Sequence, residues 1–341
     1  MDLDRLVTPE DWQAAARETL APDVFDFYAG GAGDEWTLRE NERAFTRWVL
    51  RPRVLQGGAP VDASTTVLGT PISFPVLVAP WAFQWMAHPD GEQATARAAS
   101  DAGTVMVVSS TAASTVAEVA AAGDGPKWWQ LYLATDRPLS ADLLAQAVDA
   151  GYRAICWTVD FPVMGLRLRD VRSGFTLPMG LPGTDHEFDP AMTWDDLAWI
   201  REHAGGLPVV VKGILTAADA RVAVDHGADA VVVSNHGGRQ LDRVPAALDA
   251  LPEVVAAVGG EVPVLVDGGV RRGVDVVMAL ALGAAAVMVA RPVAWGLAVA
   301  SEAGVARVLA GLRAETENAM ALLGARQVGA ITRDHVGPAT A

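Results

Sequence analysis

Eight short runs rich in Val, Ile and Leu recur along the chain, with Ala-rich helical patterns between them. Each run is apolar at consecutive positions, which is typical of parallel strands that helices cover on both faces. Several of the intervening segments end on a glycine, a common signal for the carboxyl end of a helix. The alternation predicts a (β/α)8 barrel, with a doubly wound open sheet as the alternative. The runs are residues 75–80, 104–110, 127–133, 153–160, 208–213, 229–235, 263–269 and 285–292.

Residues 1–70 precede the first predicted strand and carry two helical patterns of their own. Thr8 is placed to cap the first, TPEDWQAAARETLA, and GDEWTLRENERAFTRW forms the second. Because no change in composition marks a linker, we expect residues 1–341 to form a single barrel domain, with residues 1–70 packed on it as an N-terminal helical segment. Residues 170–193 are rich in proline and glycine and lack periodicity, so we expect a loop there, forming a lid or rim after the fourth strand.

Composition narrows the possible partners and the compartment. The net charge of −15 at pH 7 argues against nucleic acid and anionic membranes, because both bind basic faces. The longest apolar run, residues 276–290, is shorter than the ~20 residues of a membrane span, and Gly283 divides it into a helix end and a strand. A signal-peptide pattern is absent from the first residues. Cys156 is the one cysteine, which excludes an internal disulfide and favours a buried residue in a cytoplasmic protein.

Polar side chains follow nearly every predicted strand. In a barrel the carboxyl ends of the strands share one rim, and the chemistry collects there. Lys212 directly follows an apolar run and is one of only two lysines among 26 basic residues. This position indicates an ammonium group whose pKa can be shifted by burial. The alternative is a solvated strand end.

His236 and Arg239 follow the sixth predicted strand and are separated by two glycines. With Asp160 at another strand end to orient it, His236 is a candidate general base beside an arginine that can hold a carboxylate. A structural histidine is the alternative. Two further loops, with Arg271 after Asp267-Gly268-Gly269 and Arg291 after Ala290, fit the phosphate site of the last barrel loops. The histidines show no metal-ligand spacing, and neither a serine elbow nor a Cys–His pair is present, so we expect no metal.

The segment SNHGGRQLD, residues 234–242, resembles the signature of the FMN-dependent 2-hydroxy acid oxidases and dehydrogenases, which oxidise glycolate, lactate or mandelate. The resemblance extends over nearly the whole chain. It includes YAGGAGDEWTLRENERAF, WWQLY, TVDFPVMGLRLRDVRSGF, VVKGI and VDGGVRRGVDVVMALALGA in the same order. It implies a (β/α)8 barrel that binds FMN non-covalently, oxidises a small 2-hydroxy acid and assembles as a homo-oligomer, in this family a tetramer.

The same resemblance implies a role for each site residue. His236 matches the base, Asp160 its carboxylate partner, and Tyr132 the tyrosine that bonds to the reacting hydroxyl. Arg239 matches the clamp for the substrate carboxylate, and Arg167 a second arginine on the substrate side. Lys212 matches the lysine at the flavin N1 edge, where an ammonium stabilises the charge of the reduced ring. The remaining positions around FMN are Pro80, Trp81, Ala82, Ser109, Gln130, Thr158, Ser234, Asp267, Gly268, Gly269, Arg271, Ala290 and Arg291.

The chain departs from the family pattern at the substrate. Phe27 stands where the family usually has a tyrosine whose hydroxyl touches the substrate carboxylate, and Thr111 stands where small-acid oxidases often have tryptophan. One hydrogen bond is lost and space is opened, which favours a larger or aryl acid over glycolate or lactate. Met164 and its neighbours are similar to the mandelate-type oxidases, including those that act on 4-hydroxymandelate. Ala290, in place of glycine, is a mild departure near the phosphate.

Several alternatives stay open on the sequence alone. Ala82 matches the small position near flavin N5 in oxidases, and no haem domain is fused, so we expect oxygen as the electron acceptor, with a quinone or carrier protein as the alternative. The substrate could instead be a larger biosynthetic intermediate. A barrel that binds a phosphate ligand without redox activity, as a scaffold or isomerase, is the alternative from another functional class.

Overall fold

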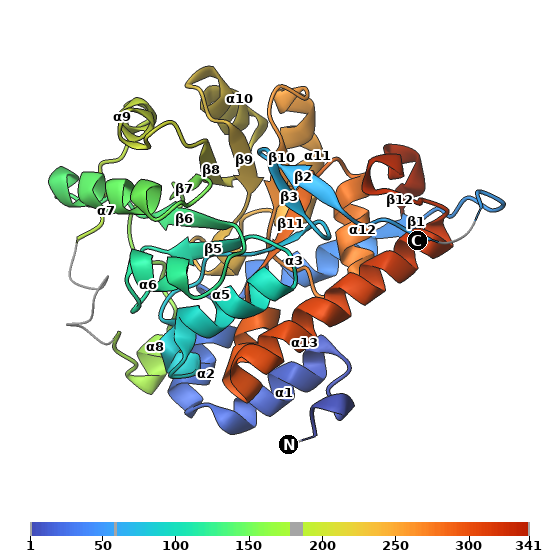
Figure 1. The fold of residues 1–341 in the computed structure, drawn as a ribbon, viewed down its shortest axis with the longest axis horizontal. Coiled ribbons are helices and arrows are strands. Elements are labelled where there is room, and N and C mark those ends of the chain that lie inside the picture. Colours follow the sequence, from blue (N-terminus) through green and yellow to red (C-terminus); the bar gives the residue numbers. More distant parts are fainter. Residues whose placement is uncertain (1, 58–59, 178–186, 340–341) are drawn as a thin grey trace.

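The computed structural model describes residues 2–57, 60–177 and 187–339 (Figure 1). Eight parallel strands form a closed barrel in the order β10-β11-β4-β5-β6-β7-β8-β9. The last strand, β11, pairs with both β10 and β4, which closes the sheet and rules out the open alternative. All eight predicted strands are confirmed, so the (β/α)8 prediction is correct. Their bounds are β4 (Val76–Val78), β5 (Met106–Ser109), β6 (Lys127–Leu131), β7 (Ile155–Thr158), β8 (Val209–Ile214), β9 (Ala230–Val233), β10 (Val264–Val266) and β11 (Ala286–Val289).

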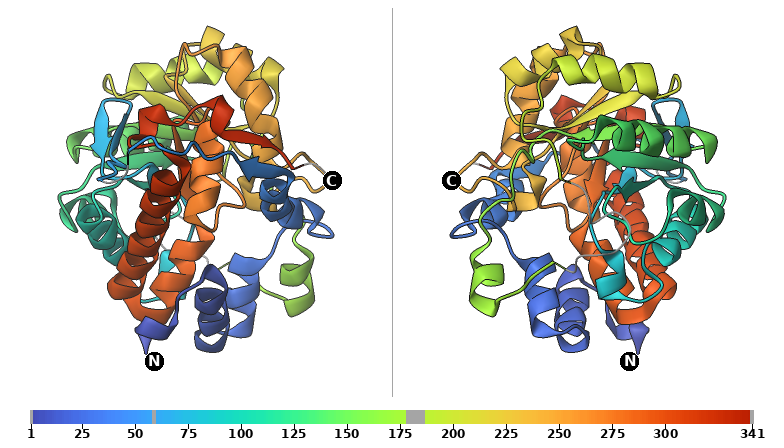
Figure 2. Two further views of the ribbon diagram at one scale, coloured as in Figure 1. Left: turned by 90° about the vertical axis from the view of Figure 1, so that its right-hand side faces the viewer. Right: turned by 90° about the vertical axis from the view of Figure 1, so that its left-hand side faces the viewer.

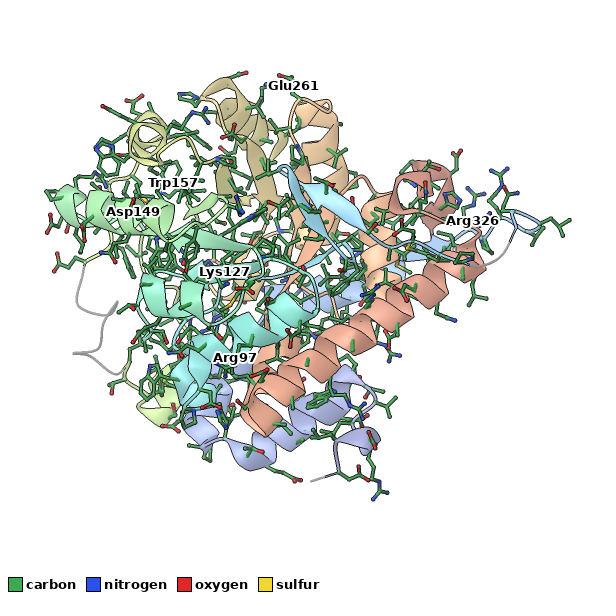
Figure 3. The ribbon with its side chains drawn as sticks, viewed as in Figure 1. Arg97, Lys127, Asp149, Trp157, Glu261 and Arg326 are labelled. Carbon is green, nitrogen blue, oxygen red and sulfur yellow. The ribbon has the colours of Figure 1, made fainter. Side chains whose placement is uncertain are left out.

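The strands are buried on both faces, as their continuous apolar runs predict. One set of side chains fills the barrel interior and includes Trp128, Cys156 and Met288, while the alternate set packs against the helices. Cys156 is fully buried, as expected, and burial raises the pKa of its thiol to about 12. Figure 3 shows the side chains filling the space between strands and helices, with Trp157 on β7 among them.

A hairpin covers the amino end of the barrel. Strands β2 (Thr65–Val67) and β3 (Thr70–Ile72) pair antiparallel, and Val67 and Ile72 belong to the same apolar cluster as the barrel interior. The chain enters β4 only four residues after Ile72, so the hairpin lies at the end opposite the strand carboxyl termini. The site therefore opens toward the other rim.

Helices surround the barrel and connect its strands. The predicted loop at residues 170–193 begins in a helix, because Asp170–Ser173 belong to α8; the loop prediction is wrong there, and residues 178–186 lie outside the described residues. Gly283 has a φ of +107° and separates α12 from β11, as expected. The helices are α4 (Gln84–Ala87), α5 (Gly91–Asp101), α6 (Val116–Ala121), α7 (Arg137–Asp149), α8 (Leu168–Ser173), α9 (Asp195–His203), α10 (Ala217–Asp225), α11 (Ala247–Val258), α12 (Gly273–Ala281) and α13 (Arg291–Leu323).

Helix α13 is the one described helix that is long and apolar enough to cross a membrane by length and composition. In this fold 56% of its most apolar window is buried inside the protein, and it packs on α1, α5 and α12. Its backbone also breaks at Ala300 and Ser301, where φ and ψ leave the helical region. These features are those of a core helix.

Before the hairpin, the N-terminal segment contains helices α1 to α3 and strand β1. Helix α1 (Pro9–Thr19) begins after Thr8, which forms the expected capping box with Asp11. Helix α3 (Trp36–Arg43) is confirmed, and α2 (Pro22–Ala29) was not predicted. Figure 2 shows α1 and α2, in dark blue, together at one end of the molecule, next to α13. Strand β1 (Trp48–Leu50) follows and pairs antiparallel with β12 (Val336–Pro338).

Candidate active site

A large cavity lies at the carboxyl ends of the barrel strands. It encloses about 1420 Å³ of empty space, including its open mouth. Nearly all of the site residues expected from the sequence line it, so the loops and strand ends that the sequence separates do meet at one rim. The expected residues that line it are Phe27, Pro80, Trp81, Ala82, Ser109, Thr111, Tyr132, Thr158, Met164, Arg167, Lys212, His236, Arg239, Asp267, Gly268, Gly269, Arg271, Ala290 and Arg291.

Three expected residues lie just behind this lining. Asp160 is hydrogen-bonded to the back of His236, and Ser234 lies between Lys212 and the backbone of His236. Gln130 is buried and links two lining hydroxyls: its Oε1 accepts from Ser109 Oγ at 3.0 Å, and its Nε2 donates to Thr158 Oγ1 at 3.0 Å. Each therefore orients a residue of the lining.

His236 is turned into the cavity by an unusual stretch of backbone. After β9 ends at Val233, residues 236, 237 and 238 take positive φ values of 58°, 64° and 74°. Two of the three are glycines, which adopt this conformation without a Cβ penalty, while His236 bears the strain. Such strain is common at functional sites, and here it directs the imidazole across the mouth of the barrel.

The imidazole is held at both nitrogens. His236 Nδ1 lies 2.9 Å from Asp160 Oδ1, and Nε2 lies 3.3 Å from Tyr132 Oη. Burial lowers the pKa of His236 below its usual value, although the Asp160 carboxylate opposes the shift. A neutral ring that donates from Nδ1 to the carboxylate keeps a lone pair on Nε2, on the side of Tyr132. The pair can thus accept a proton at Nε2, and Asp160 would stabilise the cation that forms.

Lys212 is a fully enclosed ammonium on β8. It forms an ion pair with Asp267 Oδ2 at 3.0 Å and donates to Ser234 Oγ at 2.9 Å. Burial alone would lower the pKa of Lys212, but the carboxylates of Asp267 and Asp160 outweigh it and raise the pKa. The side chain therefore stays charged, and the alternative of a solvated strand end is wrong.

Two buried guanidinium groups converge on Phe27. The carbon centres of Arg239 and Arg167 lie 4.9 Å and 5.7 Å from the centre of its ring. Arg239 Nη1 donates to the backbone oxygens of Phe27 at 2.5 Å and Gly30 at 3.0 Å, which leaves its other N–H groups for a ligand. Burial lowers the pKa of both arginines, and the neighbouring Arg167 and Arg291 lower that of Arg239 further, so an anion bound between them would stabilise their charged forms.

A second cationic region lies at the amino end of α13. Arg291 donates to the backbone oxygens of Tyr28, Gly237 and Gly30 at 3.0 to 3.1 Å, and burial together with nearby Arg271 lowers its pKa to about 9. Gly269 brings its backbone close to the N-terminal segment, because a Cβ there would lie only 2.0 Å from the backbone oxygen of Asn41. Arginines and a helix amino terminus are a usual setting for a phosphate.

The cavity fits the FMN that the resemblance implies. A phosphate needs the cationic region of Arg271 and Arg291, and a flavin ring edge needs hydrogen-bonding groups such as Lys212 and the Ser109–Gln130–Thr158 network. Among the described residues, three buried polar atoms at the lining have no hydrogen-bond partner in the protein: Arg167 Nε, Asp267 Oδ1 and Trp81 Nε1. Buried polar atoms are nearly always paired, so these atoms indicate a polar ligand. In the described part of the chain, no group of three or more His, Cys, Asp and Glu residues could hold a metal ion.

The sequence missed the aromatic and apolar part of the lining. These residues are not polar groups at predicted strand ends, although Phe161 directly follows Asp160 and its position indicates that it could line the site. They lie next to the expected polar residues and make much of the cavity wall apolar. The missed residues include Tyr28, Phe83, Phe161, Leu177 and Phe188.

The comparison with known proteins agrees with this site. The model of a family described as FMN-dependent dehydrogenase matches residues 16–338. Glycolate oxidase of Spinacia oleracea is 47% identical over 96% of this chain and 94% of its own, and L-lactate oxidase of Nostoc sp. is 48% identical over 93% and 94%. A solved structure of mandelate oxidase with 3,3-difluoro-2-hydroxy-3-phenylpropionic acid has a TM-score of 0.93 at 45% identity, covering 98% of this chain and 99% of that one. Another mandelate oxidase structure, with (S)-2-phenylpropionate, has the same TM-score at 46% identity, covering 98% of both chains.

Proposed function

Because the chain belongs to the FMN-dependent dehydrogenase family, we propose that it oxidises an aryl (S)-2-hydroxy acid of the mandelate type to the 2-keto acid. The members of the family that are similar to it are 2-hydroxy acid oxidases. Oxygen is the electron acceptor in this proposal. FMN supplies the two-electron acceptor of this oxidation when it is bound. The protein's own contribution is to bind the acid, orient it and accept its proton.

The observation that carries the proposal is the convergence of a neutral imidazole and two guanidinium groups in one cavity. Arg239 and Arg167 hold the substrate carboxylate, and Tyr132 and His236 meet the hydroxyl and the carbon that bears it. His236 accepts the proton at Nε2, where burial keeps the ring unprotonated near neutral pH. Asp160 stays ionised, since its pKa is lowered by His236 and Lys212 despite its burial, and it stabilises the imidazolium.

The preference for an aryl acid rests on Phe27 and Thr111. Phe27 carries no hydroxyl, and Thr111 Oγ1 is already paired with Ser109 Oγ at 2.8 Å, so neither needs a hydrogen bond from a small acid. Burial and stacking of one phenyl group contribute ~1.5–3 kcal/mol, which offsets the ~1 kcal/mol of the missing hydrogen bond. The mandelate oxidase structures contain phenyl-substituted acids, which supports the same preference.

A comparison of substrates tests the proposal. We expect kcat/KM for (S)-mandelate or 4-hydroxymandelate to exceed that for glycolate and lactate, and a preference for glycolate would contradict the aryl assignment. Anaerobic addition of each acid should bleach the flavin. A flavin that stays oxidised with every acid of the panel, including a larger phenyllactate, would favour a barrel without this redox activity.

The base and the oxidant need separate experiments. His236→Ala should retain FMN, but the rate at which substrate reduces the flavin should fall by at least about 10²-fold, because one general base is removed.

Rapid reoxidation of the reduced flavin in air with release of peroxide supports oxygen as the acceptor, whereas slow reoxidation supports a quinone or a carrier protein. We propose a homotetramer by family resemblance, and light scattering of the purified protein tests it.

A further inference from the structure

The cavity has an aromatic wall beside the proposed base. The rings of Phe161 and Phe188 lie 5.0 Å and 4.7 Å from the ring of Tyr132, centre to centre, and 5.6 Å from each other. Phe161 also reaches the imidazole of His236, at 5.7 Å. We call Phe161, Phe188 and Tyr132 the aromatic wall. Its members come from three segments, so the contact is made by the fold and not by the local sequence.

Both phenylalanines are held in place by their backbones. Phe161 follows Asp160 directly and is only 6% exposed. Phe188 forms an antiparallel bridge with Ala134, flanked by hydrogen bonds from Asp189 N to Leu133 O at 2.8 Å and from Thr135 N to Glu187 O at 2.9 Å. The short extension of β6 thus carries Phe188 over the ring of Tyr132.

An ion-pair cluster fixes the same segment to the barrel. Arg137, at the start of α7, donates to Asp189 Oδ2 at 2.6 Å and to Asp196 Oδ1 at 2.8 Å. Arg137 is also bonded to the backbone oxygen of Ala134 at 3.1 Å. The backbone bridge to Ala134 and the ion pairs of Arg137 therefore both fix the position of Phe188.

We propose that Phe161 and Phe188 are positioning residues for the base: they fix the orientation of the His236 imidazole and exclude water from it. The hydrogen bonds to Asp160 and Tyr132 define the two nitrogen positions. Phe161 lies against the imidazole ring, and Phe188 packs against Phe161 and Tyr132. Removing water from around an imidazole disfavours its charged form. The inference rests on the proposed function, in which His236 is the base.

The charged and titratable groups that face His236 come from every element around it. Asp160 follows β7 and favours the imidazolium, whereas Lys212 on β8 and Arg167 before α8 disfavour it. Tyr132 follows β6, and Arg239 lies in the same turn as His236 itself. Replacing Phe161 or Phe188 leaves all of these charged groups in place. A change in the titration of His236 would therefore show that water has reached the imidazole.

Three variants and one control test the proposal. In Phe161→Ala and Phe188→Ala, we expect the acidic limb of the kcat/KM profile to move up by about one pH unit, because water reaches the imidazole. We expect kcat to fall roughly tenfold, with a smaller change in KM, since the guanidinium groups are untouched. Phe161→Leu should restore the pH limb, because it keeps the site dry, and recover kcat only in part. Phe45→Leu, an equally buried phenylalanine outside the cavity lining, should leave the profile unchanged.

A measurement without turnover completes the test. Benzoate binding to the oxidised holoenzyme is followed by the change in flavin absorbance, and the midpoint of its pH dependence should move in the same direction as the acidic limb. Unchanged midpoints in both alanine variants, with normal FMN content, would overturn the inference; should Phe161→Ala fail to fold, Phe188→Ala and Phe161→Leu decide alone. If His236→Ala keeps full activity, the assignment of His236 as the base fails; if no acid of the panel reduces the flavin, the proposed function fails. Both outcomes are distinct from normal pH profiles in the wall variants.

Discussion

Lys212 is one charge in a buried pair, and its removal should be costly. Asp267 would keep its negative charge in the cavity without the ammonium 3.0 Å away. Breaking one side of a buried ion pair costs ~3–5 kcal/mol, so Lys212→Met should lower the free energy of unfolding by about that amount. Urea denaturation measures it. The double variant Lys212→Met/Asp267→Asn should recover part of the loss, and a double variant no more stable than the single one would contradict this explanation.

Arg239 is expected to be irreplaceable by lysine. Its guanidinium donates to two backbone oxygens while keeping other N–H groups free, and an ammonium cannot do both in the same geometry. Arg239→Lys should raise KM for the acid and lower kcat/KM at least about tenfold, which corresponds to 1.4 kcal/mol. Arg221→Lys, at the exposed ion pair with Glu261, is the control and should behave as the wild type. Equal kcat/KM in both variants would show that Arg239 does not bind the substrate carboxylate.

Between elements, Gly269 controls how closely α3 approaches the barrel. A Cβ on residue 269 would lie 2.0 Å from the backbone oxygen of Asn41. Gly259 has a similar positive φ, but a Cβ there meets nothing within 4 Å. Gly259→Ala should therefore cost only the ~1–2 kcal/mol of a left-handed alanine, while Gly269→Ala should cost clearly more and weaken FMN binding. Denaturation curves and FMN titrations of the two variants check this, and equal stabilities would refute the close contact.

The strands and helices differ in how well the sequence predicts them. The eight strands were predictable because each is buried on both faces and reads as one apolar run. Helix α2 was missed because it has only eight residues, too few for its polar side, Asp23 and Asp26, to repeat over several turns. The hairpin of β2 and β3 was missed because its strands, TTV and TPI, contain no apolar run, unlike the equally short β4 and β10. At the site, charge and hydrogen-bonding capacity identified His236 and Lys212, whereas Phe188 is brought to the cavity only by a bridge to Ala134, which no local pattern encodes.

Over the whole molecule, acid should loosen the contact between the N-terminal segment and the barrel. Asp242 accepts hydrogen bonds from the backbone N–H groups of Asp34, Trp36 and Thr37. Burial alone would raise the pKa of Asp242, but these N–H groups outweigh it and lower the pKa. A lowered pKa adds stability above the unfolded value of about 3.9, and this stability is lost as the pH falls through the lower folded value.

Melting temperatures between pH 7 and pH 3 test this dependence. Asp242→Asn should melt lower than the wild type at pH 7. The difference should begin to narrow below about pH 4, where the unfolded carboxylate binds a proton, and should continue to narrow toward the lowered folded pKa. Parallel curves over the whole range would show that Asp242 does not couple the fold to pH. An Asp249→Asn variant, at the exposed ion pair with Arg47, serves as the control.

The pairing of β1 with β12 has a consequence for biosynthesis. Trp48 lies opposite Pro338, and Leu50 opposite Val336, so residues made early in translation wait for partners that are made almost 300 residues later. The closing contact of the barrel, between β4 and β11, joins Val76 to Val287, which are 211 residues apart. Contacts of such long sequence separation form slowly and leave partly folded chains exposed while synthesis proceeds. A nascent chain on the ribosome must therefore keep β1 and one edge of β4 unpaired until β12 and β11 emerge. During that interval the exposed apolar runs are natural binding sites for chaperones.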